Sequence, residues 1–79
     1  VMAIEKFEVI DGYTFEYDSE NKMYECRGEV YWDEDGLYAP ERGLWRAALK
    51  LENALIRKGI AAEAEHSEKG WVMLQIYEK

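Results

Sequence analysis

The chain has 79 residues, of which 48% are hydrophobic, so it has room for one modest core and is too apolar for a disordered acidic tail. Its net charge of −7 argues against direct nucleic-acid binding, which draws affinity from Lys and Arg, and the apolar runs are too short for a membrane span. A single cysteine and a single histidine exclude an internal disulfide and a Cys/His zinc site. We therefore expect one domain over residues 1–79 in a cytoplasmic protein, without cofactor, metal, membrane or direct nucleic-acid partner.

The first half of the chain predicts three strands. Met2 follows Val1 and is the expected native start, and residues 3–10 have a mixed pattern compatible with a first strand that ends at Asp11-Gly12. Residues 13–18 alternate between aromatic and polar side chains, and alternation resumes over residues 24–32 after the turn-forming segment 19–21. These two runs predict an antiparallel hairpin, in which Gly28 marks either a bulge or a close approach of the helix.

The second half predicts one helix and a second hairpin. Pro40 and Glu41 suit a first helical turn, and Gly59 suits the position just after a helix, so we expect a helix from about residue 40 to 58. One apolar stripe follows it, formed by Leu44, Ala48, Leu51 and Leu55. Residues 60–66 and 71–77 then alternate on either side of a turn.

Together these elements predict an α+β fold in one small domain. We expect an antiparallel sheet of four to five strands with one α-helix on one face, in the order β-β-β-α-β-β. A single helix leaves the other face of such a sheet uncovered. Alternation places on that face a mixture of acids, Trp71, Met73 and Tyr77, and such a mixture is common where proteins meet.

The acids are unevenly distributed along the chain. Residues 1–38 hold eleven acids and three bases, which gives −8, whereas residues 39–79 hold six acids and seven bases, which gives +1. Because acids and aromatic residues interleave, we expect a surface that meets a basic partner protein. The residues expected to bind it are Glu16, Asp18, Glu25, Glu29, Tyr31, Asp33, Glu34, Asp35, Trp71 and Tyr77.

The helix carries a basic stripe of its own. Its bases recur at helical spacing and repel one another, so they need acids from elsewhere, such as the 33–35 segment. The stripe is either a solvated face or a secondary docking site for an acidic partner or a second copy, and its members are Arg42, Arg46, Lys50 and Arg57.

Catalytic and metal-binding patterns are weak. Cys26 and His66 both fall on the inward register, and a Cys/His pair is the minimum for a thiol nucleophile, but no third orienting group accompanies them. The 33–36 segment fails the EF-hand spacing, because Leu37 stands where the third acid is needed. A small thiol-dependent enzyme that uses Cys26 is therefore the least favoured hypothesis.

The composition resembles that of the small acidic inhibitors made by phages and mobile elements. These include DNA mimics that occupy the basic nucleic-acid channel of nucleases or CRISPR effectors. No family motif is present, so the resemblance assigns no role to a residue. The sequence favours a non-enzymatic acidic protein-binding module of this inhibitor type, whereas the alternative is a homodimeric structural or accessory subunit without inhibitory role.

Overall fold

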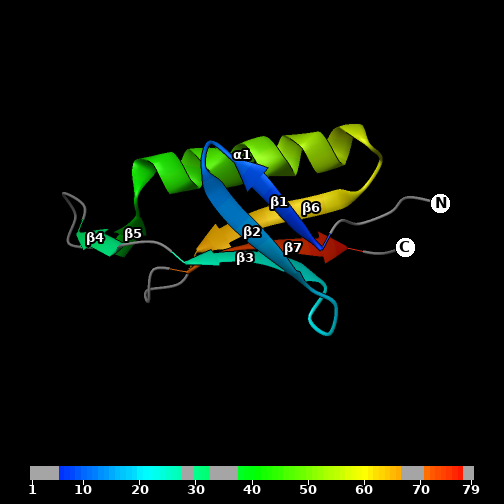
Figure 1. The fold of residues 1–79 in the computed structure, drawn as a ribbon, viewed down its shortest axis with the longest axis horizontal. Helices are drawn as coiled ribbons and strands as arrows, with labels where there is room; N and C mark the ends of the chain where they lie inside the picture. The colour runs from blue at the N-terminus through cyan, green and yellow to red at the C-terminus, as the bar shows by residue number, and fades with distance from the viewer. Residues whose placement is uncertain (1–5, 28–29, 33–37, 67–70, 78–79) are drawn as a thin grey trace.

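A five-stranded antiparallel sheet with one helix across one face forms the body of the protein (Figure 1). The computed structural model describes residues 6–27, 30–32, 38–66 and 71–77. The strands of this sheet are β1 (Phe7–Ile10), β2 (Tyr13–Asp18), β3 (Met23–Arg27), β6 (Ala61–His66) and β7 (Trp71–Tyr77). They lie in the order β1-β2-β3-β7-β6, with every neighbouring pair antiparallel. The predicted fold class and element order are thus confirmed.

The core lies between the sheet and the helix α1 (Arg42–Arg57). The inward positions of β3 and β7 are buried, as is Phe15 of β2, and the apolar stripe of the helix packs against them. Burial of this area is the main stabilising contribution in a chain this short. The core residues are Phe15, Tyr24, Cys26, Leu44, Ala47, Ala48, Leu51, Leu55, Val72, Leu74 and Ile76.

The two ends of the helix differ in how closely they follow the prediction. The helix begins two residues later than predicted, because Pro40 belongs to a short strand and Glu41 is the N-cap residue. The fixed φ of proline suits either conformation, so the sequence pattern did not separate them. At the other end, Gly59 has a φ of 84° and its N–H donates to the Ile56 carbonyl, while the Ile60 N–H donates to the Leu55 carbonyl. These two bonds form a Schellman motif, which explains the predicted stop at Gly59.

The predicted strand over residues 24–32 is divided in the structure. β3 ends at Arg27, and β4 (Val30–Trp32) pairs with β5 (Tyr38–Pro40) in a separate two-stranded sheet. This small sheet lies beyond one end of the large one (Figure 1). Alternation continues through both segments, and a period of two does not reveal which partner a strand pairs with. Gly28 lies outside the described residues, and within them no helix is long and apolar enough to cross a membrane.

Candidate functional site

The face of the five-stranded sheet that α1 leaves uncovered is the candidate site, and we call it the outer sheet face. Side chains in a strand alternate between the two faces, and the buried residues fix which positions face the helix. The remaining register positions form the outer sheet face: Phe7, Val9, Thr14, Glu16, Asp18, Met23, Glu25, Arg27, Ala61, Glu63, Glu65, Trp71, Met73, Gln75 and Tyr77.

A row of acids and apolar residues crosses the whole sheet on this face. Successive partners in the register are Phe7, Glu16, Glu25, Met73 and Glu65, one from each strand. Neighbouring strands are about 4.8 Å apart, so the row places three carboxylates within about 20 Å. Glu16 and Glu25 are direct cross-strand partners, an arrangement in which like charges destabilise the sheet.

A shallow depression lies beside this acidic pair. It is lined by Thr14, Glu16, Glu25, Cys26 and Trp71. Within the described part of the chain, no base forms an ion pair with either glutamate of the pair. The depression thus combines carboxylates with an aromatic ring, a combination suited to a Lys or Arg side chain of a partner.

Two hydrogen-bonded groups lie on the rim of the outer sheet face. The Asp18 carboxylate accepts from the Asn21 side-chain amide at 2.7 Å and from the Glu20 backbone N–H at 2.9 Å, and the bonds from Asn21 lower its pKa. The Tyr77 hydroxyl donates to Glu63 at 3.1 Å, and this bond raises the pKa of the tyrosine. Both groups are therefore held in place while they remain accessible to a partner.

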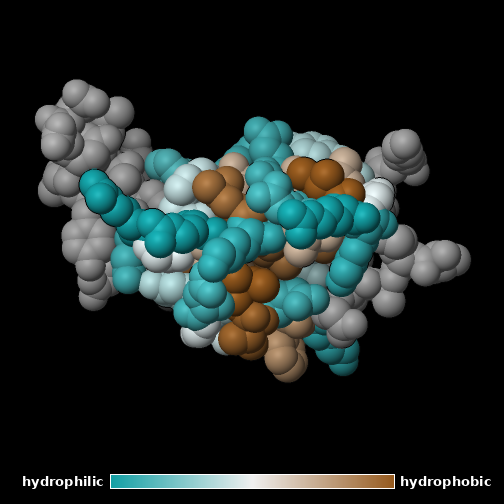
Figure 2. All heavy atoms as spheres, turned by 90° about the horizontal axis from the view of Figure 1, so that it is seen from above, coloured by the Kyte–Doolittle hydropathy of each residue, from teal (hydrophilic) through white to brown (hydrophobic). Residues whose placement is uncertain are grey.

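The basic stripe lies on the opposite side of the molecule. All four of its side chains are exposed, and Figure 2 shows hydrophilic side chains extending over the helix side with separate apolar groups between them. Lys50 forms an ion pair with Asp11 in the β1–β2 turn, with 2.6 Å between Nζ and Oδ2. The expected acids at 33–35 lie outside the described residues. The outer sheet face and the stripe therefore give the domain two sides of unlike charge.

Cys26 and His66 lie two strands apart. Both are register partners of Val72, Cys26 from β3 and His66 from β6, so about 10 Å of sheet separates their backbones. Burial raises the pKa of the Cys26 thiol, which disfavours the reactive thiolate. The rings of His66 and Trp45 form a T-shaped contact, with 5.2 Å between the ring centroids. These positions do not form the hydrogen-bonded pair that a thiol nucleophile needs.

The structure brings together five of the ten residues that the sequence assigned to a partner site. Glu16, Asp18, Glu25, Trp71 and Tyr77 share the outer sheet face. Tyr31 belongs instead to β4, in the two-stranded sheet. Residues 29 and 33–35 lie outside the described part of the chain.

The outer sheet face also contains residues that the predicted site lacks, and the most exposed apolar ones lie on β1. Phe7 and Val9 on β1 are 60% and 57% exposed, and they extend the face with apolar area next to Glu16 and Thr14. The mixed pattern of residues 3–10 did not assign them to a face. The Asp11-Gly12 pair could have predicted which face Phe7 and Val9 occupy, because a two-residue turn fixes the register of the strands it joins.

Comparisons with known proteins add no family to this description. A scan against family models, a search of curated proteins and a search of solved structures each found no match to the chain.

Proposed function

We propose that this protein is a non-enzymatic binding module that presents its outer sheet face to a basic protein. The observation that carries the proposal is the row across all five strands, which combines the acids Glu16, Glu25 and Glu65 with the apolar residues Phe7 and Met73. Carboxylates steer a basic partner toward the surface, and the apolar groups between them supply area that can be desolvated on contact.

The favoured partner is a nucleic-acid-binding protein of the cytoplasm, which the module inhibits as a DNA mimic. The α-carbons of residues two apart on a strand, such as Glu63 and Glu65, are about 6.7 Å apart. The row and the adjacent Glu63 therefore present negative charge both across and along the strands to a channel that normally receives phosphates. The placement of the basic stripe on the helix side supports this proposal, because it leaves the outer sheet face predominantly acidic.

Charge reversal on the acidic pair tests the proposal. A doubly substituted chain, Glu16→Lys with Glu25→Lys, is compared with the wild type in pull-downs from a host lysate at low and high salt. We expect capture of the basic partner to fall about tenfold or more, since like charges across an interface cost several kcal/mol. Added duplex DNA should compete with the wild-type protein for the same partner.

Glu20→Lys is a control with half the change in net charge, because it reverses one exposed acid in the β2–β3 turn, away from the row. Its capture of the partner should stay close to that of the wild type. A partner whose binding resists both salt and the double reversal would sink the proposal.

A second candidate function is supported by the exposed apolar side chains of Phe7 and Val9 on the sheet edge. They suit a homodimeric accessory subunit that pairs through β1. Sedimentation at several concentrations separates the two candidates, since a stable dimer that covers these residues favours the second one.

A further inference from the structure

The outward edge of β6 carries backbone groups that point away from the sheet. The Ala64 N–H donates to the Glu52 Oε1 atom at 3.0 Å rather than to β7. On β7, the Ile76 N–H donates to the Lys22 carbonyl at 2.9 Å, on the β3 side. Ile76 is the register partner of Ala62. Since the direction of backbone groups alternates along a strand, the N–H and C=O of Ala62 point outward as well.

Glu52 protects only part of this edge. Its carboxylate occupies the N–H of Ala64, which is a common way to block unwanted strand pairing. No strand in the described part of the chain pairs with the outward side of β6. The accessible stretch of the edge is therefore the beginning of β6, around Ala62.

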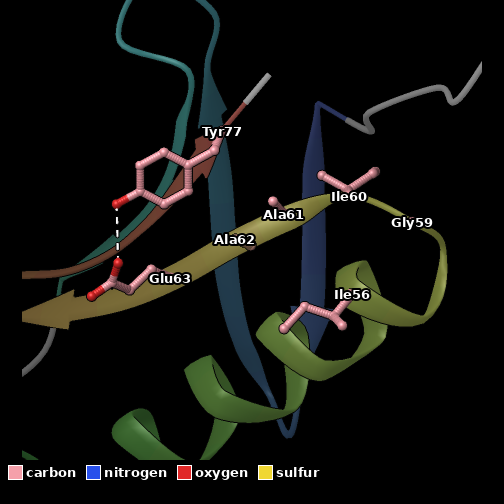
Figure 3. A pocket seen from close by; sticks show the side chains of 7 residues that line it. All are labelled: Ile56, Gly59, Ile60, Ala61, Ala62, Glu63 and Tyr77. Atoms are coloured by element: carbon pink, nitrogen blue, oxygen red, sulfur yellow. Dashed lines mark hydrogen bonds between the residues drawn. The ribbon is translucent and has the colours of Figure 1, made fainter. Parts of the chain in front are cut away.

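A hollow lies at this accessible stretch (Figure 3). Figure 3 shows Ile56 of the helix on one side of β6 and the hydrogen-bonded pair of Tyr77 and Glu63 on the other. Ile56 is 52% exposed and Tyr77 is 48% exposed, so both are accessible to a ligand. The full lining is Ile56, Gly59, Ile60, Ala61, Ala62, Glu63 and Tyr77.

We propose that the beginning of β6 binds an extended segment of a partner protein by strand addition. The segment alternates basic and apolar residues. Its backbone pairs with Ala62, its apolar side chains enter the hollow beside Ile56 and Ile60, and its basic side chains meet Glu63 and Glu65 on the outer side. The carboxylates of Glu63 and Glu65 favour a segment with basic side chains on that side.

A second copy of the chain is a poor occupant for the same reason. Antiparallel pairing of two β6 strands centred on Ala62 would place Glu63 of one copy diagonally across from Glu63 of the other, and like charges at this range repel. The edge site shares Glu63 and Glu65 with the outer sheet face but does not use the acidic pair Glu16 and Glu25, so reversal of that pair distinguishes the two proposals.

A peptide titration of the full chain tests the edge site. The probe is the hexapeptide Lys-Val-Lys-Val-Lys-Val, and its control is Lys-Lys-Lys-Val-Val-Val, which has the same charge without alternation. We expect the alternating peptide to bind at least about fivefold more tightly, since only it forms the added backbone and hollow contacts. Slower hydrogen exchange at the Ala62 amide, followed by NMR, should accompany binding.

Two substitutions in the helix distinguish peptide binding in the hollow from the general effect of an added positive charge. Ile56→Lys places a like charge in the hollow and should weaken the alternating peptide at least about fivefold. Leu49→Lys makes the same change at another exposed position of α1 outside the hollow, and it should leave binding within about twofold. Circular dichroism confirms that both variants are folded.

Equal affinity for the two peptides, equal effects of the two substitutions, or unchanged exchange at Ala62 would each overturn the edge site. The reversal Glu16→Lys with Glu25→Lys should leave the preference for the alternating peptide intact. The outer-face function and the edge site can thus fail separately.

Discussion

At the scale of single residues, Asp18 shows how a short local network acts on a titrating group. It ends β2, and its carboxylate accepts hydrogen bonds from two residues of the following turn, Glu20 and Asn21. Hydrogen bonds to the ionised form stabilise that form, which is why the pKa of Asp18 lies below its ordinary value of 3.8. The same turn leads into β3 and so positions Glu25.

Neutralisation of Asp18 should therefore have a pH-dependent effect. A carboxylate with a lowered folded-state pKa contributes stability above its unfolded-state pKa, and this contribution is lost as the pH falls through the folded-state pKa. We expect Asp18→Asn to lower the free energy of unfolding at pH about 7 and to have little effect at pH about 2. Urea denaturation across this range measures the difference.

Glu20→Gln serves as the control, since it neutralises an exposed carboxylate of the same turn. Its effect on stability should be small at every pH. If Asp18→Asn lowered the free energy of unfolding equally at low and neutral pH, the stabilisation would not come from the ionised carboxylate of Asp18.

At the scale of elements, the β1–β2 turn determines which side chains of β1 reach the outer sheet face. Asp11 and Gly12 have φ values of 52° and 85°, so both central residues of this two-residue turn are left-handed. Such a turn matches the twist of the strands and fixes their register, which brings Phe7 opposite Glu16. Asp11 also binds Lys50, which ties the turn to the helix.

Gly12→Ala should destabilise the protein by about 1 kcal/mol, because alanine is strained at this φ although no atom blocks its Cβ. Thermal unfolding measures the loss. Asp11→Asn keeps a residue that tolerates a positive φ and removes only the exposed ion pair, so its cost should stay below about 1 kcal/mol. A larger loss from Asp11→Asn than from Gly12→Ala would show that the ion pair, rather than the turn, positions β1.

At the scale of the whole molecule, charge is separated between the two sides of the domain. The outer sheet face carries Glu16 opposite Glu25, whereas the exposed bases of α1 lie behind the sheet. This arrangement costs stability, because like charges repel across a strand pair. A surface that keeps such a cost is consistent with a role in binding rather than in folding.

Removal of one charge of the pair should show this cost. We expect Glu16→Gln to raise the free energy of unfolding by about 0.2–1 kcal/mol at low salt, with a smaller gain at high salt where the repulsion is screened. Glu65→Gln is the control, because the register partner of Glu65 is Met73 rather than an acid. If both variants raised the free energy of unfolding equally, the gain would come from the lower net charge of the chain rather than from relief of repulsion between Glu16 and Glu25.

Local patterns in the sequence determined the elements and their buried faces. Strands and helices have fixed periods, which explain the alternation over residues 13–18 and 71–77 and the helical stripe around Leu51. These periods are local and do not depend on which elements are neighbours in the fold. The assignment of Glu16, Glu25 and Tyr77 to one face came from the same periods.

Only the tertiary structure decided which strands are neighbours. The placement of β7 between β3 and β6 brings Met73 between Glu25 and Glu65, and the division after Arg27 moves Tyr31 to another sheet. A period of two specifies the face of a side chain, whereas strand order depends on long-range pairing and on packing against the helix. The acidic row and the accessible edge of β6 arise from that pairing.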